Sequence, residues 1–123
     1  MYELGVKRKF SAAHQLRGYR GKCEALHGHT FMVEVRVRAE GLNEIGLAMD
    51  FKEIKSVIDR ILDRYDHALL NNVPPFDEIN PSSENLARTI HDLVKNELAE
   101  GVSVSGVTVW ESEDAWASYQ ESR

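Results

Sequence analysis

The chain has 123 residues, 42% of them hydrophobic, and a formal net charge of −5 at pH 7, which suits one domain with a packed core. The acidic balance, without a basic stripe interleaved with aromatic residues, argues against a nucleic-acid surface, and no apolar run approaches the roughly 20 residues that span a membrane. The single cysteine cannot form an internal disulfide, and the first ten residues hold no apolar stretch of signal-peptide length. We therefore expect one domain over residues 1–123, located in the cytoplasm.

Two β-strands are predicted at the start of the chain. Residues 2–13 mix β-branched and aromatic residues with charged ones, and residues 31–39 alternate strictly between apolar and polar. Residues 15–26 form a polar, glycine-containing loop between them, and loops of this length within a compact domain are usually functional. The pattern predicts an antiparallel hairpin with a long functional loop.

Two amphipathic helices follow. Asp50 and Glu53 form the pattern of a capping box, and seven apolar residues at helical spacing follow it, ending at Tyr65. A proline-containing connector then leads to Ser82 or Ser83, either of which can cap a second helix. Gly101 is expected to end that helix.

A third strand over residues 102–111 and a short fourth one over residues 116–119 complete the pattern. The order β-β-α-α-β-β predicts an α+β fold, in which a four-stranded antiparallel sheet carries two helices on one face. Such a small sheet has open edges that need a partner, so we also expect a homo-oligomer.

Three histidines form a candidate metal site. His27 and His29 are two residues apart, so their imidazoles share one face of an extended segment, and His14 ends the first predicted strand. Three imidazoles are the ligand set of a catalytic zinc with an open fourth position, and imidazole favours zinc over magnesium or calcium. In the alternative, His14 packs in the core and the other two are solvated.

Cys23 lies in the polar loop beside Lys22. A nearby cation favours the thiolate, which is both the reactive form and the metal-binding form. Cys23 is therefore a fourth ligand of a closed structural site, a proton-transferring thiol beside an open site, or an inert buried residue.

Two further positions carry groups with alternative roles. Asp66 and His67 are expected at the C-terminal end of the first helix, where they either serve an active site or place a histidinium near the helix C-terminus. Glu111 ends the third predicted strand on its mostly apolar face, where an unpaired carboxylate is costly. It either pairs with adjacent N–H donors of a substrate or lies in water at the strand end.

Several motifs together resemble one known family. They are Phe10–His14, Cys23-x-x-x-His27-Gly-His29, Met49–Phe51, Asp66-His67-x-x-Leu70-Asn71, Asn80–Asn85 and Val109–Glu111. In this order, running nearly from end to end, they resemble the 6-pyruvoyl-tetrahydropterin synthase family, and most closely its bacterial 6-carboxy-5,6,7,8-tetrahydropterin synthase branch.

The resemblance implies a tunnelling fold (T-fold) and a homohexamer built as a dimer of trimers. It implies that Zn²⁺ is bound by His14, His27 and His29. The implied catalytic residues are Cys23, Asp66 and His67. The implied substrate contacts are Glu111, which anchors the pterin ring through its 2-amino group and ring N–H, and Ser82, Ser83 and Glu84.

The implied substrate is 7,8-dihydroneopterin triphosphate, and the implied product is 6-carboxy-5,6,7,8-tetrahydropterin, with loss of acetaldehyde and triphosphate, for queuosine biosynthesis. The spacing from Cys23 to His27 fits this branch. Glu24 also creates Glu-x-x-His-Gly-His, the pattern of a branch that forms 6-hydroxymethyl-dihydropterin, so that product and 6-pyruvoyl-tetrahydropterin are alternatives. Candidate triphosphate contacts are Arg17, Arg20, Lys22 and Lys52.

A hypothesis of a different class is a non-catalytic, zinc-stabilised assembly module in which Cys23 is the fourth ligand. A structural site of this kind is closed, and the fold depends on its metal.

Overall fold

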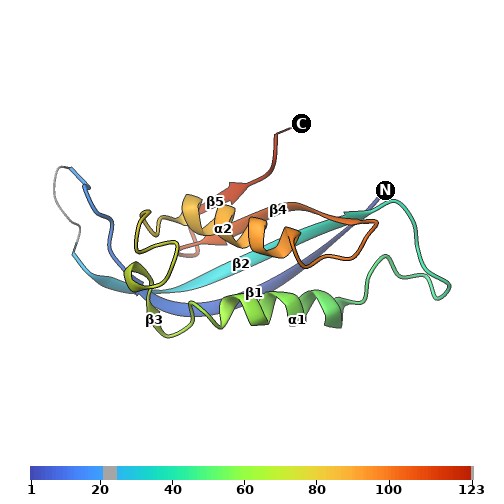
Figure 1. Cartoon of the computed structure of the whole chain (residues 1–123), viewed down its shortest axis with the longest axis horizontal. Coiled ribbons are helices and arrows are strands. Elements are labelled where there is room, and N and C mark those ends of the chain that lie inside the picture. The colour runs from blue at the N-terminus through green and yellow to red at the C-terminus, as the bar shows by residue number, and fades with distance from the viewer. Residues whose placement is uncertain (21–24, 123) are drawn as a thin grey trace.

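A computed structural model describes residues 1–20 and 25–122 of the chain. Its elements form two layers, with a five-stranded sheet on one side and two helices on the other (Figure 1). The elements are β1 (Tyr2–His14), β2 (His27–Ala39), α1 (Phe51–Leu62), β3 (Ala68–Leu69), the 3₁₀ turn η1 (Leu70–Asn72), α2 (Ser83–Lys95), β4 (Val102–Trp110) and β5 (Trp116–Tyr119).

The hairpin of β1 and β2 forms the centre of the sheet. The two strands pair antiparallel over all thirteen residues of each, from Tyr2 opposite Ala39 to His14 opposite His27. Because side chains alternate across a strand, Phe10 of β1 and Phe31 of β2 point to the same face and stack with ring centroids 4.9 Å apart. This face is the one that the helices cover, so the hairpin prediction is confirmed.

Both helices begin at the predicted caps. The side chain of Asp50 accepts a hydrogen bond from the backbone N–H of Lys52, and Ser82 accepts one from the backbone N–H of Asn85. Such caps stabilise a helix by about 1 kcal/mol each. Helix α1 packs along β1, and α2 packs along β4 and β5 (Figure 1).

The end of α2 differs from the prediction. The helix stops at Lys95, and Gly101 lies in the turn before β4 with a φ of 86°. Leu98 packs against the core from beyond the helix, so the apolar spacing continues past the point where helical backbone ends. The glycine supplies a left-handed turn rather than the helix terminus.

The sheet contains one strand more than predicted. Its order is β3-β1-β2-β4-β5, and β3 pairs parallel with Ala12 and Ala13 of β1 while the other pairs are antiparallel. Two residues are too few to show a period of two in the sequence. The α+β prediction is confirmed, and the sheet edges are formed by two short strands, β3 and β5.

The core lies between the sheet and the helices. It joins fully buried residues of β2 and β4 to the buried faces of α1 and α2, together with Tyr65, Leu70 and Phe76 from the connecting segments. Within residues 1–20 and 25–122, no helix has both the length and the apolar character needed to cross a membrane.

Candidate functional site

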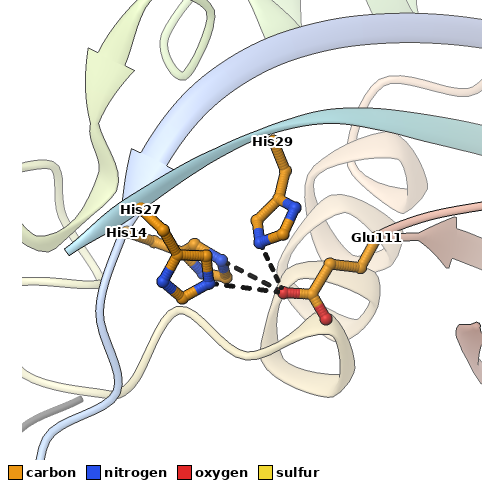
Figure 2. Close-up of side chains that lie close together, drawn as sticks. All are labelled: His14, His27, His29 and Glu111. Carbon is orange, nitrogen blue, oxygen red and sulfur yellow. Dashed lines mark ion pairs between the residues drawn. The ribbon is translucent and has the colours of Figure 1, made fainter. Parts of the chain in front are cut away.

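The three predicted metal ligands meet at one end of the central hairpin. His14 is the last residue of β1, and it lies opposite His27, the first residue of β2. His29 is two residues further along β2, so all three rings share the helix-covered face of the sheet. Their ring centroids lie 4.5 to 5.1 Å apart. Figure 2 shows their ring nitrogens directed toward a common point.

Backbone carbonyls fix two of these rings. Nδ1 of His14 lies 2.8 Å from the carbonyl oxygen of Pro81, and Nδ1 of His27 lies 2.8 Å from that of Ala25. A carbonyl oxygen can only accept, so Nδ1 carries the hydrogen in both rings. In the neutral rings, Nε2 therefore presents a lone pair, which is the form that binds a metal.

Glu111 completes the cluster. Its Oε1 atom lies 3.2 Å from Nε2 of His14, 3.1 Å from Nε2 of His29 and 3.9 Å from Nε2 of His27. Four ligands about 2.0–2.1 Å from a tetrahedral zinc would be separated by about 3.3 Å. The first two distances match that separation, and the third is somewhat longer.

The donor set fits a metal ion. His14 Nε2 is buried, and although Oε1 of Glu111 lies 3.2 Å away, no described residue makes a hydrogen bond of good geometry to it. Ring lone pairs and a carboxylate oxygen directed at one point repel each other unless a proton or a cation lies between them. His14, His27, His29 and Glu111 thus form a group that can hold a metal ion, with all four ligand atoms within 4.8 Å of one another.

Asp66 and His67 form a second pair next to the β1 edge. They lie in the turn after α1 rather than in the helix itself. Nδ1 of His67 is 3.0 Å from Oδ2 of Asp66, and Oδ1 of Asp66 accepts the backbone N–H of Ser11. The Ser11 hydrogen bond, assisted by His67, holds the pKa of Asp66 below its ordinary value. The favoured state is therefore a carboxylate beside an exposed imidazole.

An open pocket lies beside His67 and is lined by one member of the histidine cluster, His29. Its volume is about 580 Å³, and its lining includes His29, Gly28, Ser11 and His67. A Cβ atom at Gly28 would lie no closer than 3.7 Å to the nearest backbone oxygen, so the glycine is not required there by close packing. A small molecule in this pocket would lie next to His67 and His29, whereas His14, His27 and Glu111 do not line it.

The predicted substrate contacts at the start of α2 have a structural role as well. The hydroxyl of Ser82 caps the helix, Ser83 is its first residue and Glu84 lies in its first turn. The residue before them, Pro81, supplies the carbonyl that orients His14. This segment therefore adjoins the histidine cluster, and its contact with a substrate stays a prediction.

The basic residues predicted to contact a triphosphate have different surroundings in the structure. The guanidinium of Arg17 donates to the carbonyls of Ile79, Asn71 and Phe76, so it holds a loop together. Arg20 lies over the ring of Tyr19. Lys52 lies in the first turn of α1.

The predictions that concern Lys22, Cys23 and Glu24 lie outside the described residues. They include the catalytic thiol, the alternative of a sulfur ligand and the product branch suggested by Glu24. Within the described residues, the fourth group of the cluster is the carboxylate of Glu111. Its role as an anchor for a pterin ring stays a prediction.

Sequence reasoning missed two features. The Pro81 carbonyl left no signal, because any residue type offers a backbone carbonyl. The second is His91, for which the sequence pattern predicts no role: it is fully buried against the ring of Tyr119 and lies close to Asp92 and Glu121. Lys95 Nζ is 2.6 Å from the Glu121 carboxylate, so this second group already contains a cation.

Comparisons with a family model and with known proteins identify the same family. The family model described as 6-pyruvoyl tetrahydropterin synthase matches residues 3–122. A protein of Archaeoglobus fulgidus named "Putative 6-carboxy-5,6,7,8-tetrahydropterin synthase" is 40% identical over 93% of this chain and 91% of its own length. The 6-carboxy-5,6,7,8-tetrahydropterin synthase of Haemophilus influenzae is 28% identical over 98% of this chain and all of its own length.

A relative with a different name is also similar. The dihydroneopterin monophosphate aldolase of Pyrococcus furiosus is 35% identical over 85% of each chain. Among solved structures, the 6-pyruvoyl tetrahydropterin synthase of Caenorhabditis elegans superposes with a TM-score of 0.81, covering 99% of this chain and 98% of that one at 24% identity. The structural likeness confirms the T-fold. The chain belongs to the 6-pyruvoyl tetrahydropterin synthase family.

Proposed function

We propose that the chain is a zinc-dependent enzyme that converts 7,8-dihydroneopterin triphosphate to 6-carboxy-5,6,7,8-tetrahydropterin, with release of acetaldehyde and triphosphate, in queuosine biosynthesis. The family match and the names of its relatives support a pterin-synthase reaction in general. The observation that carries the proposal is the convergence of His14, His27 and His29 on one point, with Nδ1 of two rings bonded to backbone carbonyls.

The three imidazoles are the proposed zinc ligands. Neutral rings held in one tautomer lose little freedom when they bind a cation, and imidazole suits zinc. When bound, Zn²⁺ supplies Lewis-acid stabilisation of negative charge on the side-chain hydroxyls of the substrate.

Proton transfer is assigned to His67, Asp66 and Cys23. The imidazole of His67 is 83% exposed, so it can reach a substrate in the adjoining pocket. Asp66 orients this ring, since its Oδ2 atom lies 3.0 Å from Nδ1 of His67. We assign Cys23 the second proton-carrying role at the substrate side-chain carbons.

Substrate binding is assigned to Glu111 and to the start of α2. A carboxylate can accept two parallel hydrogen bonds from the 2-amino group and ring N–H of a pterin. Glu111 lies beside the histidines, so a pterin held there would place its side chain near the metal ligands. Ser82, Ser83 and Glu84 are proposed to contact the same substrate, because they follow Pro81 in the chain.

An alternative product is 6-hydroxymethyl-dihydropterin. Glu24 supports it, because it creates Glu-x-x-His-Gly-His in this sequence. The similarity to the aldolase of Pyrococcus furiosus also supports it. Cys23 favours the carboxy product, because a thiol supplies an acid–base group in a suitable pKa range.

Product analysis tests the proposal. The zinc-loaded protein is incubated with 7,8-dihydroneopterin triphosphate, and the products are identified by mass spectrometry. Carboxy-tetrahydropterin with acetaldehyde is expected, whereas 6-hydroxymethyl-dihydropterin would establish the alternative. Cys23→Ala is expected to abolish turnover and to keep the metal, and Glu24→Gln is the matched control that should keep the carboxy product. Normal turnover by Cys23→Ala would contradict the role of the thiol.

The assembly-module hypothesis makes opposite predictions. With Cys23 as a fourth ligand, chelation would unfold the chain, and X-ray absorption would detect sulfur beside zinc. The proposed enzyme should stay folded without metal and show only nitrogen and oxygen ligands.

We also propose a homohexamer built from two trimers. The short edge strands β3 and β5 leave both sides of the sheet available for pairing within residues 1–20 and 25–122, and Trp116 at the β5 edge is 61% exposed. Strand pairing between subunits would cover both edges.

A further inference from the structure

Asparagine side chains hold the segment that follows β1. The backbone N–H of Gln15 donates to Oδ1 of Asn71, and Nδ2 of Asn71 donates to the carbonyl of Gln15, both at 2.9 Å. Asn80 makes the same two bonds with Arg17, at 2.8 and 2.9 Å. Each side-chain amide thus closes a ring of two hydrogen bonds with one residue, as the backbone does in a hydrogen-bonded pair of an antiparallel ladder.

The two hydrogen-bonded rings lie just beyond the end of β1. Strand β1 ends at His14, and β3 pairs only with Ala12 and Ala13. Beyond these pairs, the side chains of Asn71 and Asn80 hold the backbone of Gln15 and Arg17. They therefore fix the main chain immediately after His14.

Asn80 also controls the acceptor that orients His14. Its carbonyl accepts Nδ2 of Asn85 at 2.8 Å, while its side chain is bonded to Arg17. Pro81 follows directly, and its carbonyl faces Nδ1 of His14. The position of this carbonyl therefore depends on bonds that Asn80 makes in two directions.

We propose that Asn71 and Asn80 are positioning residues of the metal centre. They set the backbone position and ring direction of His14 without contacting metal or substrate. This inference rests on the proposed role of His14 as a metal ligand. Outer groups that orient a histidine ligand typically contribute about 10–100-fold to metal affinity.

A merely structural role would change stability alone. The matched control is Asn43, whose Oδ1 accepts the backbone N–H groups of Ile45 and Leu47, both at 3.0 Å. Asn43 lies in the loop after β2, and His27 is at the opposite end of that strand. Asn43→Ala therefore also removes two hydrogen bonds between a side-chain amide and the backbone, at a place remote from the site.

The experiment compares Asn71→Ala, Asn80→Ala and Asn43→Ala with the unmodified chain. It measures the Kd for Zn²⁺ by chelator competition, the visible absorption of bound Co²⁺, and the Tm of the metal-free proteins. Asn71→Ala and Asn80→Ala are expected to bind Zn²⁺ about 10–100-fold more weakly, with altered Co²⁺ bands. Asn43→Ala should lower Tm without changing Kd or the bands.

Unchanged Kd and Co²⁺ bands in a folded Asn80→Ala would overturn the inference. If this variant does not fold, Asn85→Ala replaces it, because it removes the bond to the Asn80 carbonyl and keeps the backbone cap bond to Ser82. Unchanged metal binding in both Asn71→Ala and Asn85→Ala would then overturn it. Failure of the unmodified chain to bind metal would instead contradict the metal centre of the proposed function, and this inference with it.

Discussion

Asp66 and His67 are consecutive residues, yet their side chains meet, with Oδ2 and Nδ1 3.0 Å apart. His67 has a φ of 57°, in the left-handed region that non-glycine residues adopt infrequently. Its backbone N–H donates to the carbonyl of Ser11, whose own N–H donates to Asp66. This reciprocal connection to β1 holds the unusual turn and directs an imidazole into the pocket.

The lowered pKa of Asp66 predicts a stability change in acid. The group binds a proton less readily when folded than when unfolded, so its contribution is fully present above its ordinary pKa of 3.8 and is lost as pH falls through the folded pKa. Asp66→Asn can still accept from Ser11 but carries no charge. Urea unfolding should give this variant a lower free energy of unfolding than the unmodified chain at neutral pH. The difference in free energy should become smaller below about pH 4. A difference independent of pH would contradict this account.

Two histidine variants should show that metal binding and proton transfer depend on different residues. His29→Ala removes a ligand atom and should weaken Zn²⁺ binding by more than about 100-fold. His67→Ala should keep the metal, because its ring bonds to Asp66 rather than to the cluster, and should reduce kcat by roughly 10²–10⁴-fold. Elemental analysis and steady-state kinetics on both proteins check the pair. Loss of metal from His67→Ala would show that the two groups form one site.

The cap of α2 can be tested with neighbouring serines. Ser82→Ala removes the acceptor for the Asn85 backbone N–H and should lower the free energy of unfolding by about 1 kcal/mol. Ser83→Ala changes the first helical residue and should have little effect, since alanine favours helix. Chemical denaturation of both variants measures the difference. Equal losses would indicate that Ser82 does not act as the cap.

The proposed assembly predicts a particle of six 14.0 kDa chains. Native mass spectrometry should detect the hexamer and, at lower concentration, trimers. Trp116→Lys at the β5 edge should favour smaller species, because a charged edge residue opposes strand pairing. A monomer at micromolar concentration in the unmodified chain would refute the assembly.

The long elements of the fold were predictable, because each has a strong period. The alternation in residues 31–39 and the caps at Asp50 and Ser82 correspond to the observed β2, α1 and α2. Strand β3 was not predictable, because its two residues are defined only by their neighbours in β1. The end of α2 was misplaced because Leu98 keeps the apolar spacing without the helix.

In the candidate site, too, local features were predictable and long-range contacts were not. The shared face of His27 and His29 follows from strand geometry alone, and the position of His14 follows from the hairpin. The approach of Glu111 to the imidazoles depends on how β4 pairs with β2, from Met32 opposite Trp110 onward. The contact of Pro81 with His14 joins segments 67 residues apart, which no local pattern encodes.

The pairing of His14 with His27 at the end of a thirteen-residue hairpin also affects folding. A slip of one residue between β1 and β2 would send His14 to the opposite face from its partners. A slip of two residues would separate the rings by roughly 7 Å along the strand direction. Any cation bound by all three rings would therefore stabilise only the observed alignment of β1 and β2, so metal binding would favour the correct strand register.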